Sequence, residues 1–262
     1  MNRSILKYPG SKWRIAKWIV SMIPKHHSYL EPFFGSGAVL FNKTPSRIET
    51  INDWDDDVVN LFRIVRDNPV PLIEAVEATP YSRSEYETAY AGRSDDVCDI
   101  EKARRFLIRC WQGHGFRTTG EKVGWKNDVQ GREAAYAMRH WNSLPEWLLE
   151  AMERLKMVQI DSRPAVEVIK RFNYPNVFIY ADPPYVLSTR CRKQYKHEMT
   201  DSDHIELLTA LREHKGTCII SGYDNELYNE YLQGWEKRRI SSADQLSRPR
   251  TETVWMNFNT EE

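Results

Sequence analysis

Short apolar runs alternate with helical patterns along most of the chain, and this alternation restricts the possible folds more than any other feature. Each run is bounded by glycine, proline or aspartate, as strands commonly are. The candidate strands are Tyr29–Phe34, Ile48–Ile51, Met157–Ile160, Val177–Ala181, Thr217–Ser221 and Val254–Phe258. Strands that alternate with helices form a mostly parallel sheet covered on both faces. The pattern therefore predicts an α/β fold.

Two helices have the clearest signals. Asp55 to Asp57 place negative charge at the amino end of the first, which favours a helix start there. Its apolar residues follow the spacing of one helical face: Val58, Leu61, Phe62 and Val65. The second helix begins near Asp201, and we expect Gly216 to end it.

One long segment between the second and third candidate strands contains no convincing strand. It spans residues 63–154, and its apolar residues have helical spacing, as in Ala103, Phe106, Leu107 and Cys110. We interpret it as a helical insertion into a sheet domain formed by residues 1–62 and 155–262.

The insertion concentrates positive charge, although the whole chain has 37 basic and 37 acidic residues. Between Lys102 and Trp141 only Glu121, Asp128 and Glu133 oppose the bases, which are Lys102, Arg104, Arg105, Arg109, Arg117, Lys122, Lys126, Arg132 and Arg139. Such segregation can present a basic surface to phosphates while the protein stays neutral overall. A solvated helical surface is the alternative interpretation.

The composition predicts a soluble cytoplasmic protein. The chain has 262 residues, of which 41% are hydrophobic, and this is enough to bury a core. No run approaches the roughly 18 to 20 apolar residues of a membrane span. The four cysteines are widely scattered, which favours reduced thiols and no metal site.

The segment Glu31–Gly37 has the character of a cofactor loop, because it follows an apolar strand and opens a helical segment. Glycine lets the backbone turn sharply and approach a ligand, and the helix that follows offers free N–H groups. The candidate cofactor residues are Glu31, Phe33, Gly35, Ser36 and Gly37. Asp53 lies 18 residues after Gly35, where an acidic side chain can bind ribose hydroxyls. Leu40 replaces the third glycine of the dinucleotide pattern, which counts against NAD or FAD.

The segment Asp182–Tyr185, Asp-Pro-Pro-Tyr, directly follows an apolar strand. Proline has no backbone donor, so the Asp182 carboxylate and the Pro183 carbonyl form an edge of acceptors only. That edge suits an amine with two N–H donors, such as adenine N6, and Tyr185 supplies a face for a base to stack on. A loop without chemistry is the alternative for such a Pro-Pro turn.

The two loops meet if the sheet is doubly wound. The first and fourth strands then neighbour each other where the strand order reverses, and ligands bind in that crevice. A nucleoside-containing cofactor and an amine would therefore lie side by side.

Together these segments resemble the Dam-type DNA adenine N6-methyltransferases over nearly the whole chain. The matching segments are Leu6–Lys12, Glu31–Gly37, Asn52–Asp53, Asp182–Tyr185, Ile219–Tyr223 and Glu252–Asn257. The resemblance implies a Rossmann-like methyltransferase sheet with an inserted helical target-recognition domain, and S-adenosylmethionine as cofactor. It makes Asp182, Pro183, Pro184 and Tyr185 the catalytic loop, and it adds Tyr8, Lys12, Asp53 and Asp182 as cofactor contacts.

Double-stranded DNA is the partner that the resemblance implies, with the target adenine flipped out of the stack. The segment Gly113–Gly120 is similar to the family's recognition segment, but the residues that follow depart from the GATC readers, so the target sequence stays open. Arg117 is the best candidate for a base contact, since arginine can bind a guanine edge with two hydrogen bonds. The other predicted DNA contacts are basic: Lys7, Lys122, Lys126, and, in the loop Ser188–His197, Arg190, Arg192 and Lys193.

Two alternatives remain at this point. The first is a methyltransferase acting on another amine, namely RNA adenine, cytosine N4 or a protein glutamine. The second is a non-catalytic DNA-binding relative. The sequence also leaves open a restriction endonuclease partner, and whether the protein is a monomer or a weak dimer.

Overall fold

The computed structural model describes residues 3–91, 97–127, 129, 136–190, 192–243 and 249–260. Its centre is a seven-stranded sheet with the order β3-β2-β1-β4-β5-β7-β6. The strands are β1 Ser28–Glu31, β2 Ile48–Asn52, β3 Val158–Asp161, β4 Val177–Ala181, β5 Thr217–Gly222, β6 Glu236–Ala243 and β7 Pro249–Met256. β1 to β5 are parallel to one another, β7 pairs antiparallel with β5, and β6 pairs antiparallel with β7. The predicted α/β fold with a mostly parallel sheet is confirmed.

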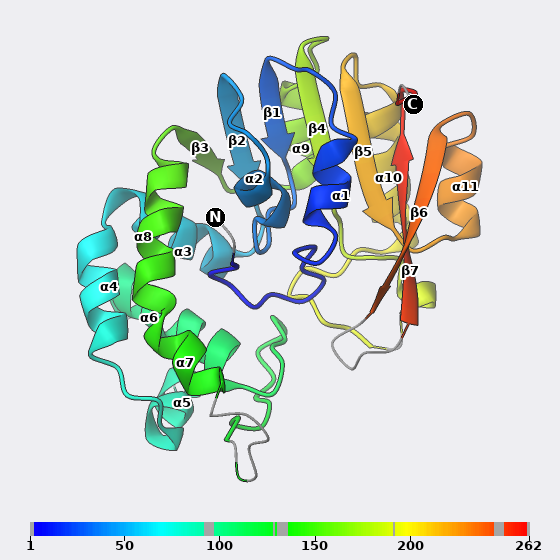
Figure 1. Cartoon of the computed structure of the whole chain (residues 1–262). Coiled ribbons are helices and arrows are strands. Elements are labelled where there is room, and N and C mark those ends of the chain that lie inside the picture. Colours follow the sequence, from blue (N-terminus) through cyan, green and yellow to red (C-terminus); the bar gives the residue numbers. More distant parts are fainter. Residues whose placement is uncertain are drawn as a thin grey trace.

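Helices cover both faces of the sheet (Figure 1). One face packs on α1 Ala16–Ser21, α2 Ala38–Asn42 and α3 Asp56–Asp67, and the other on α9 Ala165–Arg171, α10 Asp201–Arg212 and α11 Glu226–Tyr231. Successive strand residues point to opposite faces. In β1, accordingly, Tyr29 belongs to the core on the face covered by α1, α2 and α3, and Leu30 to the core on the opposite face.

The helix predicted to start at Asp55–Asp57 begins as expected, since the Asp55 side chain accepts from the Asp57 amide and caps α3. The prediction for Gly216 is wrong, because α10 ends at Arg212 and Gly216 lies just before β5. A Cβ at Gly216 would lie 2.1 Å from the Val177 carbonyl oxygen, so glycine there permits close strand packing.

Two strands at the edge differ from the sequence prediction. β7 begins at Pro249, ahead of the predicted Val254, and β6 was not predicted. The β6 sequence, Glu-Lys-Arg-Arg-Ile-Ser-Ser-Ala, is too polar to resemble a buried strand, and its place at the sheet edge explains why.

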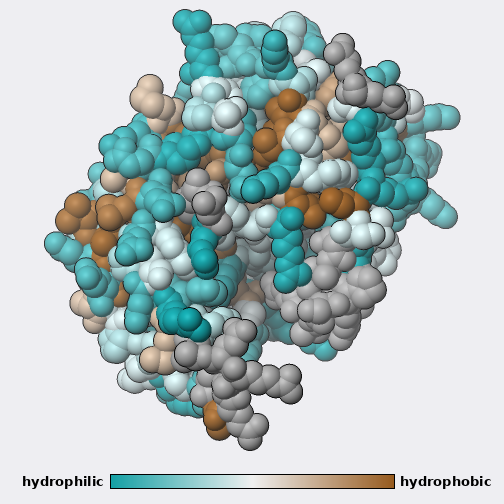
Figure 2. Space-filling model, viewed as in Figure 1, coloured by the Kyte–Doolittle hydropathy of each residue, from teal (hydrophilic) through white to brown (hydrophobic). Residues whose placement is uncertain are grey.

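The described part of the predicted insertion is mainly helical, apart from the segment 113–127, where Gly113 and Trp125 form an isolated β-bridge. It contains α4 Pro69–Glu77, α5 Arg83–Tyr90, α6 Asp99–Gln112, α7 Tyr136–Asn142 and α8 Leu144–Leu155, which group together at one end of the sheet (Figure 1). The proposed boundaries at 62/63 and 154/155 fall inside α3 and α8. Buried residues of α6 and α8 share one core with those of β1 and α2. The face seen in Figure 2 is mostly hydrophilic, with a hydrophobic patch at its left over α4.

Candidate active site

A cavity of about 610 Å³ opens beside the carboxyl ends of β1, β2 and β4. β1 and β4 are neighbours in the sheet, with Ser28 opposite Val177. The strand order reverses there, as expected for the crevice that binds ligands in such folds. The cavity is lined by the turn before α1, the loops after β1, β2 and β4, the start of α9 and the loop before α10.

The loop after β1 is built around two left-handed glycines. Gly35 has φ +47° and Gly37 has φ +66°, and a Cβ at Gly37 would lie 2.4 Å from the Phe34 ring. Gly35 lines the cavity together with Glu31, Phe33 and Ser36, whereas Gly37 caps the start of α2 outside the described lining. Gly37 therefore shapes the loop that the other predicted residues present to the cavity.

Asp53 both braces this loop and faces the cavity. Its Oδ2 accepts from the Gly35 amide at 2.8 Å, and its Oδ1 accepts from the Asp55 amide at 2.9 Å. Burial raises the pKa of Asp53 to about 7. Since a carboxylate offers roughly four lone-pair positions, Asp53 keeps acceptor capacity for a ligand hydroxyl.

Glu31 is a second buried carboxyl on the cavity wall, at the end of β1. The Tyr29 hydroxyl donates to its Oε2 at 2.8 Å. Burial raises the pKa of Glu31 to about 8. The cavity thus combines a dry environment with acidic groups, and this combination suits a ligand that carries positive charge.

Asp182 follows β4 and reaches the same cavity. Its Oδ1 lies 3.1 Å from Lys12 Nζ, which also donates to the Gly10 carbonyl at 2.6 Å. Burial raises the pKa of Asp182 to about 6, although the Lys12 charge opposes the shift. Asp182 is consequently ionised at neutral pH and can act as an acceptor.

Tyr185 is more enclosed than the sequence suggested. The residue is 8% exposed, and its hydroxyl donates to Glu252 Oε2 at 2.6 Å. The Lys12 ammonium lies 4.7 Å from the centre of its ring. Among the described residues, Pro184 lines the cavity, whereas Pro183 and Tyr185 are buried and are not part of its lining. The ring is close to Asp182 but does not present an open face.

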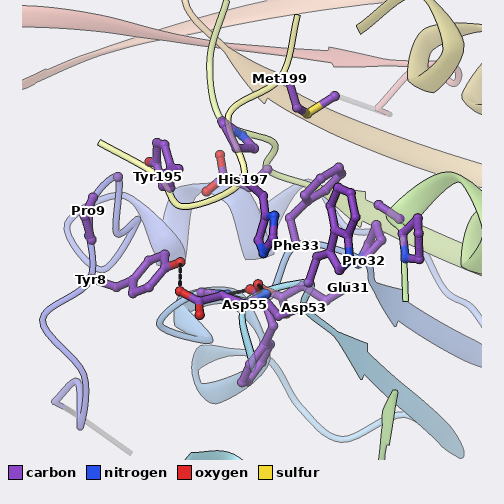
Figure 3. Close-up of a pocket in the computed structure, with 18 of the residues that line it drawn as sticks. Tyr8, Pro9, Glu31, Pro32, Phe33, Asp53, Asp55, Tyr195, His197 and Met199 are labelled. Carbon is purple, nitrogen blue, oxygen red and sulfur yellow. Dashed lines mark hydrogen bonds between the residues drawn. The ribbon is translucent and has the colours of Figure 1, made fainter. Parts of the chain in front are cut away.

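The loop before α10 lies over the cavity, opposite Asp53 and Asp55 (Figure 3). Tyr195 contacts the ring of Tyr8, whose hydroxyl donates to Asp55 at 3.3 Å. His197 stacks on Trp54 with ring centres 4.5 Å apart. Tyr195, His197, Trp54 and Asp55 were not predicted as residues of this cavity, because their roles depend on packing between distant loops.

The same loop contacts the recognition segment. The Thr118 amide donates to the Gln194 carbonyl at 3.0 Å, and the Lys196 amide donates to the Thr118 hydroxyl. The recognition role of Gly113–Gly120 stays a prediction, and Thr118 joins this segment to the loop over the cavity. Arg117, next to it, forms an ion pair with Glu121 and is about one-third exposed.

Several bases of the insertion are paired with acidic side chains, which reduces the basic surface expected from the sequence. Arg104 pairs with Glu85 and Glu101, and Arg109 pairs with Asp57. Lys122 is exposed, 3.9 Å from Glu87. Lys126 lies over the Tyr136 ring and Lys7 over the Trp111 ring, where burial lowers the Lys7 pKa to about 8. Arg132 lies outside the described residues.

The three bases predicted in the loop after the catalytic segment behave differently. Arg192 and Lys193 are exposed. Arg190 differs from the prediction, because its side chain is 10% exposed, pairs with Glu198 and donates to the Tyr185 carbonyl at 2.7 Å. Arg190 therefore braces the loop in this arrangement and is poorly placed for a phosphate.

Other site types find little support in the described part of the chain. No group of three or more His, Cys, Asp or Glu side chains there could hold a metal. Cys98, Cys110 and Cys218 are free thiols, and Cys191 lies outside the described residues. No helix within the described ranges is both long enough and apolar enough to span a membrane.

Comparison with known proteins agrees with this geometry. Residues 8–246 match the model of the family described as D12 class N6 adenine-specific DNA methyltransferase. A DNA adenine methylase of Salmonella typhi is 35% identical, covering 88% of this chain and 84% of its own. The type II methyltransferase M1.LlaDCHI of Lactococcus lactis subsp. cremoris is 26% identical, covering 98% and 95%. The type II methyltransferase M.MjaIII of Methanocaldococcus jannaschii is 23% identical, covering 91% and 90%.

The family match spans the glycine loop, the helical insertion and the Asp182–Tyr185 segment, so it covers every element that lines the cavity. The chain belongs to the D12 class of N6 adenine-specific DNA methyltransferases.

Proposed function

We propose that the cavity holds S-adenosylmethionine next to an acceptor edge, made by Asp182 and the Pro183 carbonyl, that binds N6 of an adenine flipped out of duplex DNA. D12 enzymes use this cofactor, and when bound it supplies an electrophilic methyl group on a sulfonium. The observation that carries the proposal is the position of Asp182, which lines the same cavity as the glycine loop and Asp53.

The cavity has the size and chemistry for the cofactor. About 610 Å³ lies within the range of pockets for ligands of this size. Asp53 would accept from ribose hydroxyls, and Glu31 would face the cationic part of the ligand. Phe33 and Trp54 supply apolar surface at the rim, and Tyr8 and Lys12 close the side next to α1.

Asp182 and the Pro183 carbonyl act by accepting hydrogen bonds from the two N–H groups of the amine. The lone pair of an exocyclic amine is delocalised into the ring, so the nitrogen is a poor nucleophile. Two acceptors that bind both N–H groups favour tetrahedral nitrogen and localise its lone pair. Asp182 serves as an acceptor and not as a strong base, because the amine becomes acidic once it is methylated.

Base flipping requires a rearrangement around Tyr185, since its ring has no open face in this structure. The Lys12 ammonium contacts both groups that we assign to binding the adenine, namely the Asp182 carboxylate and the Tyr185 ring. We infer that an entering base displaces this ammonium and takes over both contacts.

Flipping costs a few kcal/mol, which phosphate contacts and stacking offset. Arg192, Lys193 and Lys122 are the exposed bases that would make phosphate contacts, and Arg117 would read a base once it leaves Glu121.

Replacement of Asp182 by alanine tests the proposal. We expect methyl transfer to DNA to fall by about 100-fold or more, because one of two acceptors that localise the lone pair is lost. The measurement is incorporation of labelled methyl groups, with digestion to nucleosides to identify N6-methyladenine. Asp161→Ala is the matched control, since Asp161 ends β3 and pairs with Arg163 and Arg171, and none of the three is among the described lining residues. Normal turnover by a folded Asp182→Ala protein would contradict the assignment.

A further inference from the structure

A carboxylate distant in sequence from the catalytic segment holds the Tyr185 side chain. Glu252 lies on β7, and its Oε2 accepts from the Tyr185 hydroxyl at 2.6 Å. A buried tyrosine hydroxyl needs a hydrogen-bond partner, and a charged acceptor makes the bond stronger. We propose that Glu252 is a positioning residue that fixes the axis of the Tyr185 ring beside Asp182. This inference rests on the proposed role of Tyr185 as the surface that receives the flipped base.

The topology explains why β7 supplies this group. β7 runs antiparallel to β5, with Thr253 opposite Gly222, so Glu252 lies next to the carboxyl end of β5. The parallel strands β4 and β5 end at the same edge of the sheet, where β4 is followed by Asp182. A strand added in the opposite direction therefore brings an acidic residue to the catalytic loop from outside the parallel sheet.

The ring of Tyr185 is restrained in two complementary ways. The hydroxyl lies on the axis about which χ2 turns, so the bond to Glu252 fixes the direction of the ring axis but not the ring plane. The plane is restrained by Tyr223, which packs edge-to-face with ring centres 4.7 Å apart, and by the Lys12 ammonium over the ring. Because terminal sp³–sp² torsions such as χ2 of tyrosine are broad, the backbone alone would leave this plane loosely set.

Glu252 also belongs to the charge balance of the site. Burial lowers the pKa of Lys12, but Asp182 and then Glu252 raise it, so that the net shift is upward. The ammonium pairs with Asp182 and is also attracted by the charge of Glu252, with the Tyr185 ring next to it. Loss of Glu252 would free the ring, while Lys12 keeps its ion pair with Asp182 on the cavity wall. Glu252 itself is not among the described lining residues.

A double-mutant cycle tests the proposal. Glu252→Ala and Tyr185→Phe remove the two ends of one hydrogen bond, and each should lower kcat about 10- to 100-fold, the range for a bond to a charged group. The double variant should lose no more than either single variant. Glu252→Gln keeps an acceptor and should stay within about threefold of the original enzyme. KM for the cofactor should stay unchanged in all four proteins. Glu230→Ala, an exposed residue on α11, is the control and should behave normally.

A readout independent of turnover uses DNA with 2-aminopurine at the target adenine. A ring held in place stacks on the flipped base and limits its fluorescence, so Glu252→Ala and Tyr185→Phe should both give a brighter complex than Glu252→Gln. If Glu252→Ala does not fold, as judged by its melting temperature, Tyr185→Phe and Glu252→Gln carry the same comparison.

Three results would overturn the proposal: normal kcat in Glu252→Ala, losses that multiply in the double variant, or a loss in Glu252→Gln as large as in Glu252→Ala. These are separable from failure of the proposed function. Turnover by Asp182→Ala would contradict the proposed function itself. An inactive Asp182→Ala together with a normal Glu252→Ala would contradict only the role of Glu252.

Discussion

Burial raises the pKa of three of the carboxyl groups on the cavity wall to values near neutrality: Asp182 to about 6, Asp53 to about 7 and Glu31 to about 8. At pH 7 the site therefore binds more protons than the same groups would in water. A ligand with positive charge favours the ionised carboxylates, because opposite charges lower a carboxyl pKa.

Cofactor binding should consequently release protons, and affinity should rise as the pH increases from about 6 to 8. Calorimetric titration at pH 7 in two buffers with different ionisation enthalpies measures the number of protons released. Glu31→Gln should reduce this number, since an amide does not titrate. Equal binding enthalpies in both buffers, after correction for dilution, would show that the three groups stay in one protonation state.

At the residue scale, the sequence predicted groups that lie in short motifs. The glycine loop, Asp53 and Asp182 were identified because each follows a strand, and strands of a parallel sheet end at one edge. Trp54, His197 and Glu252 were missed as site residues. Their contacts join segments far apart in the chain, and no local spacing encodes them.

At the element scale, Thr118 connects the recognition segment to the loop over the cavity. Thr118→Val should keep the shape of this contact but remove the acceptor for the Lys196 amide. A neutral hydrogen bond contributes about 0.5–1.5 kcal/mol, so amide exchange at Lys196 should accelerate about 2- to 10-fold. Hydrogen exchange read by NMR or mass spectrometry measures this directly.

Thr119→Val is the matched control for Thr118→Val, because Thr119 is exposed and adjacent. It should leave exchange in residues 192–199 unchanged. If both variants exchange alike, the loop is held by Tyr195 and His197 and not by Thr118.

The prediction of elements succeeded where burial produced a pattern. β4, with five buried residues in succession, was predicted at its observed bounds. β6 was missed because an edge strand needs no continuous apolar run, and the helix stop at Gly216 was wrong because strand packing, not helix capping, requires glycine there.

At the scale of the whole molecule, the sequence predicted the parallel sheet, the position of the insertion and the Dam-type resemblance that the D12 family match confirms. It could not show how closely the insertion is joined to the sheet. Arg154 at the end of α8 donates to Glu49 of β2 and to the Leu40 carbonyl of α2, and these contacts link segments more than 100 residues apart. The domain division at 62/63 and 154/155 stays a prediction.

A shared core implies that the sheet and the insertion unfold together. Leu148 on α8 is fully buried in the core that also contains Phe62 and Tyr29, so Leu148→Ala should lower the free energy of unfolding by about 2–5 kcal/mol. Its neighbour Leu149 is 45% exposed, and Leu149→Ala should cost less than about 0.5 kcal/mol. Differential scanning calorimetry should show a single transition that Leu148→Ala moves as a whole, because no part of this core can melt while the rest keeps its packing. Two transitions, of which Leu148→Ala lowers only one, would mean that the insertion folds as a separate unit.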